Sequence, residues 1–167
     1  RLTATGNVFI VNPNGVVFGR GASVDVGGLV ATTANLSNSN FMAGRFLFDQ
    51  ASTVPGASIV NEGSISIREG GLAALVAPTV RNSGIITARL GRVVLAGAET
   101  ATVDLYGDGL LAFDTGVSTS VTQQGGIDAD GGSVLLTTAQ AKGVVDGAIN
   151  MGGTVTARSV EKKGGKI

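Results

Sequence analysis

Short runs of alternating apolar and polar residues, separated by glycines, make up most of the chain. In these runs Ile, Val, Leu and Ala alternate with Ser, Thr, Arg and Asp, which is the period-two pattern of a sheet with one buried face. No window of ten or more residues shows a convincing helical period. The runs predict β-strands at Ser64–Ile67, 72–76, 85–88, 93–96, 103–105 and 134–137. An all-β protein is therefore expected.

The strands recur in similar stretches, each of which begins with a glycine. These are "GSISIREGGLAALVAP" from Gly63, "GIITARLGRVVLAGAE" from Gly84, "GGIDADGGSVLLTTAQ" from Gly125 and "GTVTARSVEKKGGKI" from Gly153, with Ile65, Ile86, Ile127 and Val155 at matching places. The interval from Ile65 to Ile86 predicts a coil of about 20 residues. The next interval is about twice as long and predicts two coils, with a degenerate one at 102–114. The last interval predicts a coil with a loop of about seven extra residues.

This period, with two or three strands per repeat, predicts a parallel β-helix, or β-solenoid. One such coil cannot enclose a core, whereas stacked coils bury a continuous apolar column. Small residues expected in the narrow interior are Ala73, Ala88, Ala96 and Ala129. About eight coils would give a rod of roughly 35–40 Å, and a β-sandwich is the structural alternative. Residues 37–57 fall outside the repeat, and 38–48 ("NSNFMAGRFLF") predict a loop or hairpin that covers the helix.

The stretch "NVFIVNPNGVVFG" places an Asn12-Pro13-Asn14-Gly15 turn between two β-rich runs. Pro13 fixes its φ angle and Gly15 tolerates positive φ, so the turn suits a corner of a coil. Asn12, Asn61 and Asn82 each precede a glycine by two or three residues, which predicts similar corners and a ladder of stacked amides. The glycines Gly63, Gly84 and Gly125 are expected to shape the repeat corners, by supplying positive φ.

Composition excludes several classes of function. The chain has no Cys and no His, which removes thiolate and imidazole metal sites, Cys nucleophiles and Ser-His triads, and no cofactor is expected. Its net charge is +0 and its longest basic block is Lys162-Lys163, so no nucleic-acid partner is expected. The apolar runs are far shorter than the about 20 residues that cross a bilayer. Because the sequence begins at Arg1 without an initiator Met or a signal peptide, it is interpreted as part of a longer product.

Two sets of charged residues are candidates for chemistry. Polysaccharide-active β-helix enzymes would need paired carboxylates, and the acids available for this are Asp104, Asp108, Asp114, Asp128 and Asp130. Asp beside Gly is also common turn chemistry, which is the interpretation we favour. Arg68, Arg89 and Arg158 fall at equivalent strand ends of three repeats and predict an outward row. Such a row either binds acidic glycans or keeps the rod soluble, and we favour the second role.

A family resemblance covers much of the chain. From Gly6, "GNVFIVNPNGVVFGRGASVDVGGLVATTANLSNSNFMAGRFLF" closely resembles the haemagglutination-activity, or two-partner-secretion (TPS), domain of filamentous haemagglutinin-type exoproteins. The likeness continues from Ile59 through "IVNEGSISIREGGLAALVAPTVRNSGIITARLGRVVLAGAETATVDLYGDGLL". It is close over roughly residues 4–113, while the rest resembles the repeats that follow, and the N-terminal part of the family domain is missing.

The resemblance implies a right-handed parallel β-helix that forms a single domain over residues 1–167, with the secretion-domain region in 1–113 and further coils in 114–167. It implies export across a Gram-negative outer membrane by a barrel transporter whose periplasmic domains recognise this region. The Asn-Pro-Asn motif that the family links to secretion matches Asn12, Pro13 and Asn14. Such exoproteins usually act as adhesins, haemolysins or growth inhibitors through regions elsewhere in a longer chain.

We therefore expect a segment of a secreted, surface-exposed adhesin that acts in cell adhesion and as a structural rod and is not an enzyme. Its expected partners are the transporter and a host-cell or glycan receptor. Two alternatives stay open: a subunit of a self-assembling extracellular filament that associates end to end, and a polysaccharide-active enzyme. The residues expected to matter are Asn12, Pro13, Asn14 and Gly15 at the secretion motif, and Asn61, Gly63, Asn82, Gly84 and Gly125 at the repeat corners.

Overall fold

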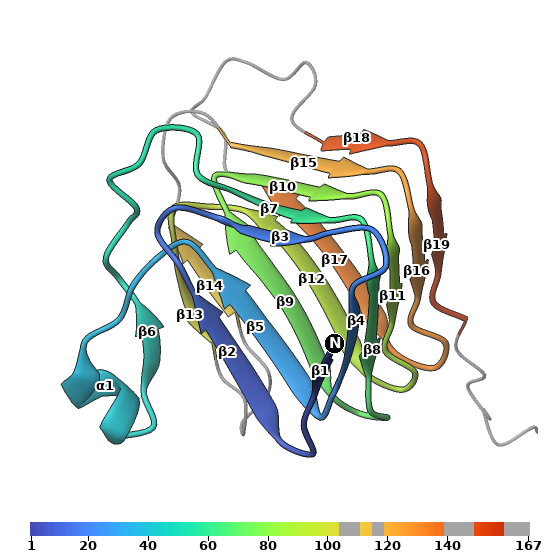
Figure 1. Ribbon diagram of the computed structural model, residues 1–167, viewed down its shortest axis with the longest axis horizontal. Coiled ribbons are helices and arrows are strands. Elements are labelled where there is room, and N and C mark those ends of the chain that lie inside the picture. Colours follow the sequence, from blue (N-terminus) through green and yellow to red (C-terminus); the bar gives the residue numbers. More distant parts are fainter. Residues whose placement is uncertain (104–110, 115–118, 139–148, 159–167) are drawn as a thin grey trace, which may run out of the picture.

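Three parallel β-sheets form three sides around a shared core, and the chain passes through them in turn (Figure 1). The computed structural model describes residues 1–103, 111–114, 119–138 and 149–158. The first sheet holds β1 (Leu2–Thr3), β4 (Ser23–Val26), β8 (Ser64–Ile67), β11 (Ile85–Thr87), β16 (Gly126–Asp128) and β19 (Thr154–Thr156). The second holds β2 (Asn7–Val11), β5 (Gly28–Thr32), β9 (Leu72–Ala77), β12 (Arg92–Gly97) and β17 (Ser133–Thr138). The third holds β3 (Val16–Phe18), β7 (Ser58–Asn61), β10 (Thr79–Asn82), β15 (Ser120–Gln123) and β18 (Ile149–Met151).

Each passage through the three sheets is one coil, which confirms the predicted parallel β-helix. Coil 1 is β1–β3, coil 2 is β4, β5 and β7, and coil 3 is β8–β10. Coil 4 is β11, β12 and β15, coil 5 is β16–β18, and β19 begins the next turn. Every pairing within the three sheets is parallel, as a solenoid requires.

The strand register corrects two predictions about the repeat. Ile65 pairs with Ile86, as their spacing of one predicted coil requires. Ile86 also pairs directly with Ile127, so this longer interval is one coil with a large insertion, and the predicted degenerate coil at 102–114 is wrong. Ile127 pairs with Val155, which confirms a single coil with extra residues there. The described first sheet therefore has six layers, fewer than the predicted eight coils.

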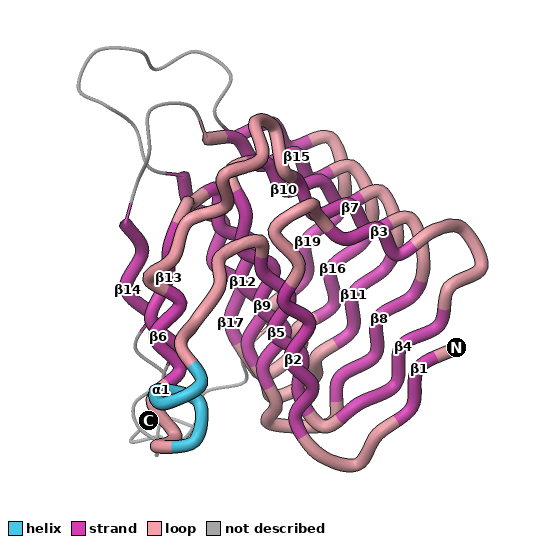
Figure 2. Tube along the Cα trace, turned by 60° about the vertical axis from the view of Figure 1, so that its left-hand side comes forward, coloured by secondary structure: helices cyan, strands magenta, loops and turns pink. Residues whose placement is uncertain are grey.

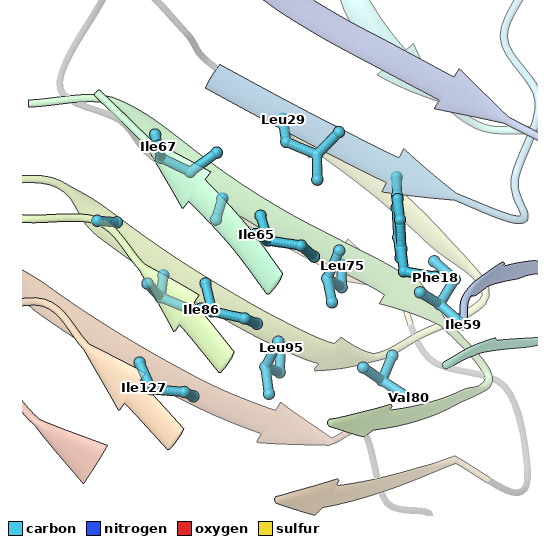
Figure 3. Close-up of a cluster of buried hydrophobic side chains, with 14 of the residues drawn as sticks. Phe18, Leu29, Ile59, Ile65, Ile67, Leu75, Val80, Ile86, Leu95 and Ile127 are labelled. Atoms are coloured by element: carbon cyan, nitrogen blue, oxygen red, sulfur yellow. The ribbon is translucent and has the colours of Figure 1, made fainter. Parts of the chain in front are cut away.

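The interior core is a column of apolar side chains, to which each layer contributes residues at equivalent positions (Figure 3). In the first sheet, the alternating pattern directs Val24, Ile65, Ile86 and Ile127 inward, and their exposed fractions are all 4% or less. Leu75 and Leu95 of the second sheet pair in register and face the same space. Burial of a large aliphatic side chain stabilises by roughly 1.5–3 kcal/mol, so the column is the main source of stability.

A second apolar cluster, the outer cluster, lies on the opposite face of the second sheet. It contains Val30, Ala74, Val76, Val94 and Ala96, which alternate with the inward residues of β5, β9 and β12. Runs such as "LAALVA" in β9 are apolar at every position, without alternation, because both faces of this sheet are buried. Ala73, Ala88 and Ala129 face the interior as predicted, but Ala96 belongs to the outer cluster, so its predicted interior position is wrong.

A small antiparallel sheet covers the outer cluster (Figure 2). It consists of β6 (Phe46–Phe48), β13 (Thr100–Val103) and β14 (Leu111–Asp114), with the short helix α1 (Asn38–Met42) beside β6. The excursion predicted at 37–57 is present. The loop or hairpin predicted for 38–48 is wrong, because the Ser37 hydroxyl accepts a hydrogen bond from the Asn40 N–H and caps α1, and because β6 pairs with the distant β13. Within the described residues, no helix is long and apolar enough to cross a membrane.

Candidate recognition corner and amide ladder

Asn12 to Gly15 form the corner between β2 and β3, which lie in different sheets, so the turn is a corner of a coil as expected. The Gly15 N–H donates to the Asn12 carbonyl at 3.0 Å, and the Asn14 N–H donates to Asn12 Oδ1 at 3.0 Å. These two bonds, which both lie within the motif, close a tight turn. The Asn12 N–H donates to the Thr32 carbonyl of the next coil at 3.0 Å. The side chains of Asn12, Pro13 and Asn14 face solvent.

The excursion of coil 2 supports this corner from one side. The Ser52 hydroxyl donates to the Pro13 carbonyl at 2.6 Å. Gly15 has a φ angle of 103°, and a Cβ added there would lie 2.6 Å from the Ser58 carbonyl oxygen. Both its backbone angle and its close neighbour therefore require glycine at this position. The predicted roles of Pro13 and Gly15 in the turn fit this geometry.

A ladder of buried amides lies at a different corner, where the third sheet leads into the first. Asn61 Nδ2 donates to Asn82 Oδ1 at 2.8 Å, and Asn82 Nδ2 donates to Gln123 Oε1 at 2.8 Å. Gln123 Nε2 donates in turn to the Gly125 carbonyl at 3.0 Å, and all three side chains are fully buried. The predicted ladder through Asn61 and Asn82 is thus present. Gln123 was missed, although it lies as far beyond Asn82 as Ile127 lies beyond Ile86, which was a signal for it.

Asn12 lies outside this ladder, which corrects the prediction that it shares a corner with Asn61 and Asn82. Phe18 of β3 pairs with Asn61, so an aromatic residue takes the ladder's place in coil 1. The sequence offset of Asn12 from a glycine was misleading because Asn12 follows a strand of the second sheet, whereas Asn61 ends a strand of the third.

The corner glycines are needed for close stacking between coils. Gly63, Gly84 and Gly125 lie above one another, and a Cβ on Gly84 would meet the Gly63 carbonyl oxygen, just as a Cβ on Gly125 would meet that of Gly84. None of the three has positive φ, so the predicted conformational reason for them is wrong. Their missing Cβ lets successive backbones approach, which is the second general use of glycine.

Two of the candidate acids are held in surface ion pairs. Asp128 approaches Arg89 at 3.9 Å, and Asp130 approaches Arg158 at 3.1 Å. Hydrogen bonds from Arg158, first from its side chain and then from its backbone, hold the pKa of the Asp130 carboxyl below its usual value of 3.8. Exposed pairs of this kind contribute little stability.

The predicted arginine row is a row of mixed charge. The carbonyls of Arg89, Asp130 and Arg158 accept equivalent backbone hydrogen bonds from the preceding coils, so these three residues share one position in successive layers. Glu69 takes the same position in coil 3, and Arg68 lies one residue before it. The predicted equivalence of Arg68 with Arg89 is therefore wrong, and acids alternate with arginines along the row.

Three further acids are candidates for chemistry in the sequence. Asp104 and Asp108 lie outside the described residues, and Asp114 lies in β14. Among the residues that the structure describes, no group of three or more acids is arranged to hold a metal ion.

The fold and its corners define a class: a β-solenoid domain whose backbone pairs coil on coil, with a solvent-exposed Asn-Pro-Asn corner in coil 1. Comparison with known proteins identifies the class further. The family model described as "TPS secretion domain" matches residues 1–167, and the chain belongs to this family of two-partner secretion domains.

Similar proteins agree with this assignment. The crystal structure of the HMW1 secretion domain from Haemophilus influenzae superimposes with a TM-score of 0.78 and 26% sequence identity, over 95% of this chain and 42% of that chain. A heme/hemopexin-binding protein of Haemophilus influenzae (strain ATCC 51907 / DSM 11121 / KW20 / Rd) is 30% identical over 135 residues, which are 76% of this chain. A second heme/hemopexin-binding protein of Haemophilus influenzae is 50% identical over 44 residues, 24% of this chain and 5% of its own length.

The chain spans 15% of the length of the first of these heme/hemopexin-binding proteins. It is the secretion domain of an exoprotein that two-partner secretion carries across the outer membrane to the cell surface or the medium. In two-partner secretion, a partner transporter exports such an exoprotein.

Proposed function

We propose that this domain directs a longer adhesin to its own outer-membrane barrel transporter, whose periplasmic domains recognise the Asn12–Gly15 corner. The observation that carries the proposal is the corner itself: three exposed polar or rigid side chains on a turn closed by its own hydrogen bonds. Because those bonds stay within the motif, the turn can form in a chain that has not yet folded into coils. A transporter could therefore read the same shape before and during folding.

Asn14 is the residue on which to test recognition. Its side chain is exposed, and the turn uses only its backbone N–H. We expect Asn14→Ala to leave thermal unfolding unchanged while it lowers export into the medium about fivefold, the effect of one lost hydrogen bond to the transporter. Asn150→Ala, at an exposed position of β18, is the matched control. Unchanged export of the Asn14→Ala protein would refute a role for this side chain.

The adhesive activity is proposed to lie outside this domain, with the domain serving for delivery and as the first part of a rod. Two relatives are named as heme/hemopexin-binding proteins. This chain has no His and no Cys, two of the usual haem ligands, so we propose no haem site in it. We expect the purified domain to leave host cells and glycans unbound while the full exoprotein binds them. Attachment by the domain alone would place the receptor site here instead.

The filament alternative has one supporting observation. Ile149 and Met151 continue the interior columns of the third sheet but are 43% and 53% exposed, since no described strand pairs beyond β18. A further coil of the exoprotein or a second copy of the domain would cover them. We propose the first, which predicts that the full exoprotein stays monomeric in light scattering, whereas end-to-end filaments seen by electron microscopy would favour the second.

The domain is proposed to have no catalytic role. Asp128 and Asp130, the candidate carboxylates whose side chains are described, each form a surface ion pair with an arginine. Incubation of the protein with acidic and neutral polysaccharides should release no reducing or unsaturated ends. Turnover that is lost in an Asp128→Asn variant would overturn this part of the proposal.

A further inference from the structure

Two insertions that leave the helix two layers apart meet on its outer surface. The first, which carries α1 and β6, lies between β5 and β7 of coil 2, and the second, which carries β13 and β14, lies between β12 and β15 of coil 4. β6 and β13 pair antiparallel, with Phe46, Leu47 and Phe48 opposite Val103, Thr102 and Ala101. Coil 3 carries no such insertion, because only Pro78 separates β9 from β10. We call this pairing of β6 with β13 the clasp (Figure 2).

The inner side of the clasp completes the outer cluster. Phe48, Ala101 and Val103 are 0%, 4% and 2% exposed and pack in one cluster with Val30, Ala74 and Val94. The last three come from coils 2, 3 and 4, and β13 also contacts β9 of coil 3. Without the clasp, three successive layers would present an apolar face to water, which folded sheets avoid.

Aromatic contacts extend the clasp toward the first coil. The Phe9 ring of β2 stacks on the Phe46 ring with centroids 4.6 Å apart, and Phe41 of α1 meets Phe9 edge to face at 5.9 Å. The excursion therefore covers coil 1 as well as coil 2. The same excursion contacts the recognition corner through Ser52, whose hydroxyl donates to the Pro13 carbonyl.

The two halves of the clasp are far apart in sequence. Leu47 and Thr102 are directly opposite in the antiparallel pair, although six strands of the helix, β7 to β12, lie between them in the chain. Among the described strands, β6 pairs with β13 alone. Closing so long a loop costs conformational entropy that only the completed contact can offset. The excursion of coil 2 therefore cannot reach its final hydrogen bonding before β12 of coil 4 has been laid down.

We propose that the clasp makes coils 2, 3 and 4 one cooperative folding unit, which closes only when coil 4 is complete. The interior column alone would let layers add one at a time, since each layer contacts only its neighbours. The clasp adds a contact that skips a layer. In a chain exported from its N-terminus, the outer apolar face of β5 and β9 would remain open until residue 103 has emerged.

Hydrogen exchange on the whole domain tests this proposal, with Phe48→Ala to weaken the clasp. We expect exchange in β7, β9 and β12 to rise together by about 100-fold or more, the size of effect that loss of a buried Phe produces. Leu47→Ala is the matched control, because Leu47 is the neighbouring residue on the solvent side and is 36% exposed. If exchange rises only in α1, β6 and β13, the coils fold independently of the clasp and the proposal is wrong.

A covalent clasp gives a second test that survives if Phe48→Ala fails to fold. The chain has no native Cys, so Leu47→Cys with Thr102→Cys can form a single disulfide across the pair. Its oxidation should slow exchange in β7, β9 and β12 together by at least about 10-fold. A control pair, Val17→Cys with Val60→Cys, joins neighbouring strands β3 and β7 and should protect those strands most. Protection confined to β6 and β13 in the oxidised clasp would overturn the proposal.

Discussion

The coils and the clasp bury apolar surface in opposite ways. In the coils, one residue type recurs at one position in layer after layer, as Ile65, Ile86 and Ile127 do, and each contact lies one layer away. In the clasp, Phe48 and Ala101 meet once and across a whole coil. The repeat therefore determines the architecture, while the single, unrepeated contact is what we propose joins its layers into a unit. Substitutions at repeated positions and at exceptions to the repeat separate the two contributions.

The largest loss of stability is expected at a corner glycine, where the stacked backbones leave no room for a Cβ atom. In Gly84→Ala the new Cβ would overlap the Gly63 carbonyl oxygen, so the corner must open and the free energy of unfolding should fall by about 4 kcal/mol. Urea unfolding measures this change. Gly19→Ala is the control, because no atom lies within 4 Å of a Cβ there and its φ is not positive. Equal stability of the two variants would show that the coils do not stack this closely.

The amide ladder should give the next largest effect. Asn82→Ala removes the middle amide and leaves Asn61 Nδ2 and Gln123 Oε1 buried without partners, at a cost of about 3 kcal/mol. Arg81→Ala changes the adjacent, outward side chain of β10 and should alter stability by less than about 0.5 kcal/mol. Thermal and urea unfolding of both variants provide the comparison. A loss for Asn82→Ala that lies within error of the control would contradict the ladder.

The domain should become more stable when Leu90, an exception to the repeat, is replaced by the glycine found at its position in neighbouring coils. Gly70, Leu90 and Gly131 occupy the same corner in successive coils with φ angles of 77°, 54° and 76°, so Leu90 adopts a backbone that disfavours a side chain. Its side chain is 60% exposed and contributes little burial. Leu90→Gly should raise the free energy of unfolding by about 0.5–1 kcal/mol. Ile85→Gly, at an exposed strand residue of the same coil, should lower it by a similar amount, and the same sign in both variants would refute the strain.

The smallest effect concerns Asp130, an acid of the mixed-charge row. Arg158 lowers the carboxyl pKa in the folded state, so the contribution to stability is present above the unfolded-state value and is lost as pH falls through the folded value, below 3.8. Asp130→Asn should therefore be slightly less stable than the wild type at neutral pH and equal to it in acid. Thermal melts at several pH values and salt concentrations test this. A difference that persists in strong acid would have another cause.

The repeating architecture could be predicted from the sequence, whereas the contact between two unrepeated segments could not. The spacing of Ile65 and Ile86 predicted parallel coils, and the family likeness predicted secretion. The interval from Ile86 to Ile127 was misread because an insertion of nearly one coil in length has the same spacing as a second coil. β6 and β13 could not be paired in advance, since the two strands are far apart in the chain and neither belongs to the repeat. The outer cluster had one signal, the continuous apolar run of β9, which marks a strand buried on both faces.

The number of layers in the first sheet can be measured as a distance between its two ends. Thr3, Asp25, Ser66, Thr87, Asp128 and Thr156 form one outward row of the first sheet, one residue per layer. Spin labels on Thr3→Cys and Thr156→Cys should then be separated by five steps between layers, a backbone distance of about 24 Å. Pulsed electron–electron double resonance measures this distance. If the two double-length intervals, from Val24 to Ile65 and from Ile86 to Ile127, each contained an additional coil, the separation would be about 34 Å, and a distance near that value would contradict the account.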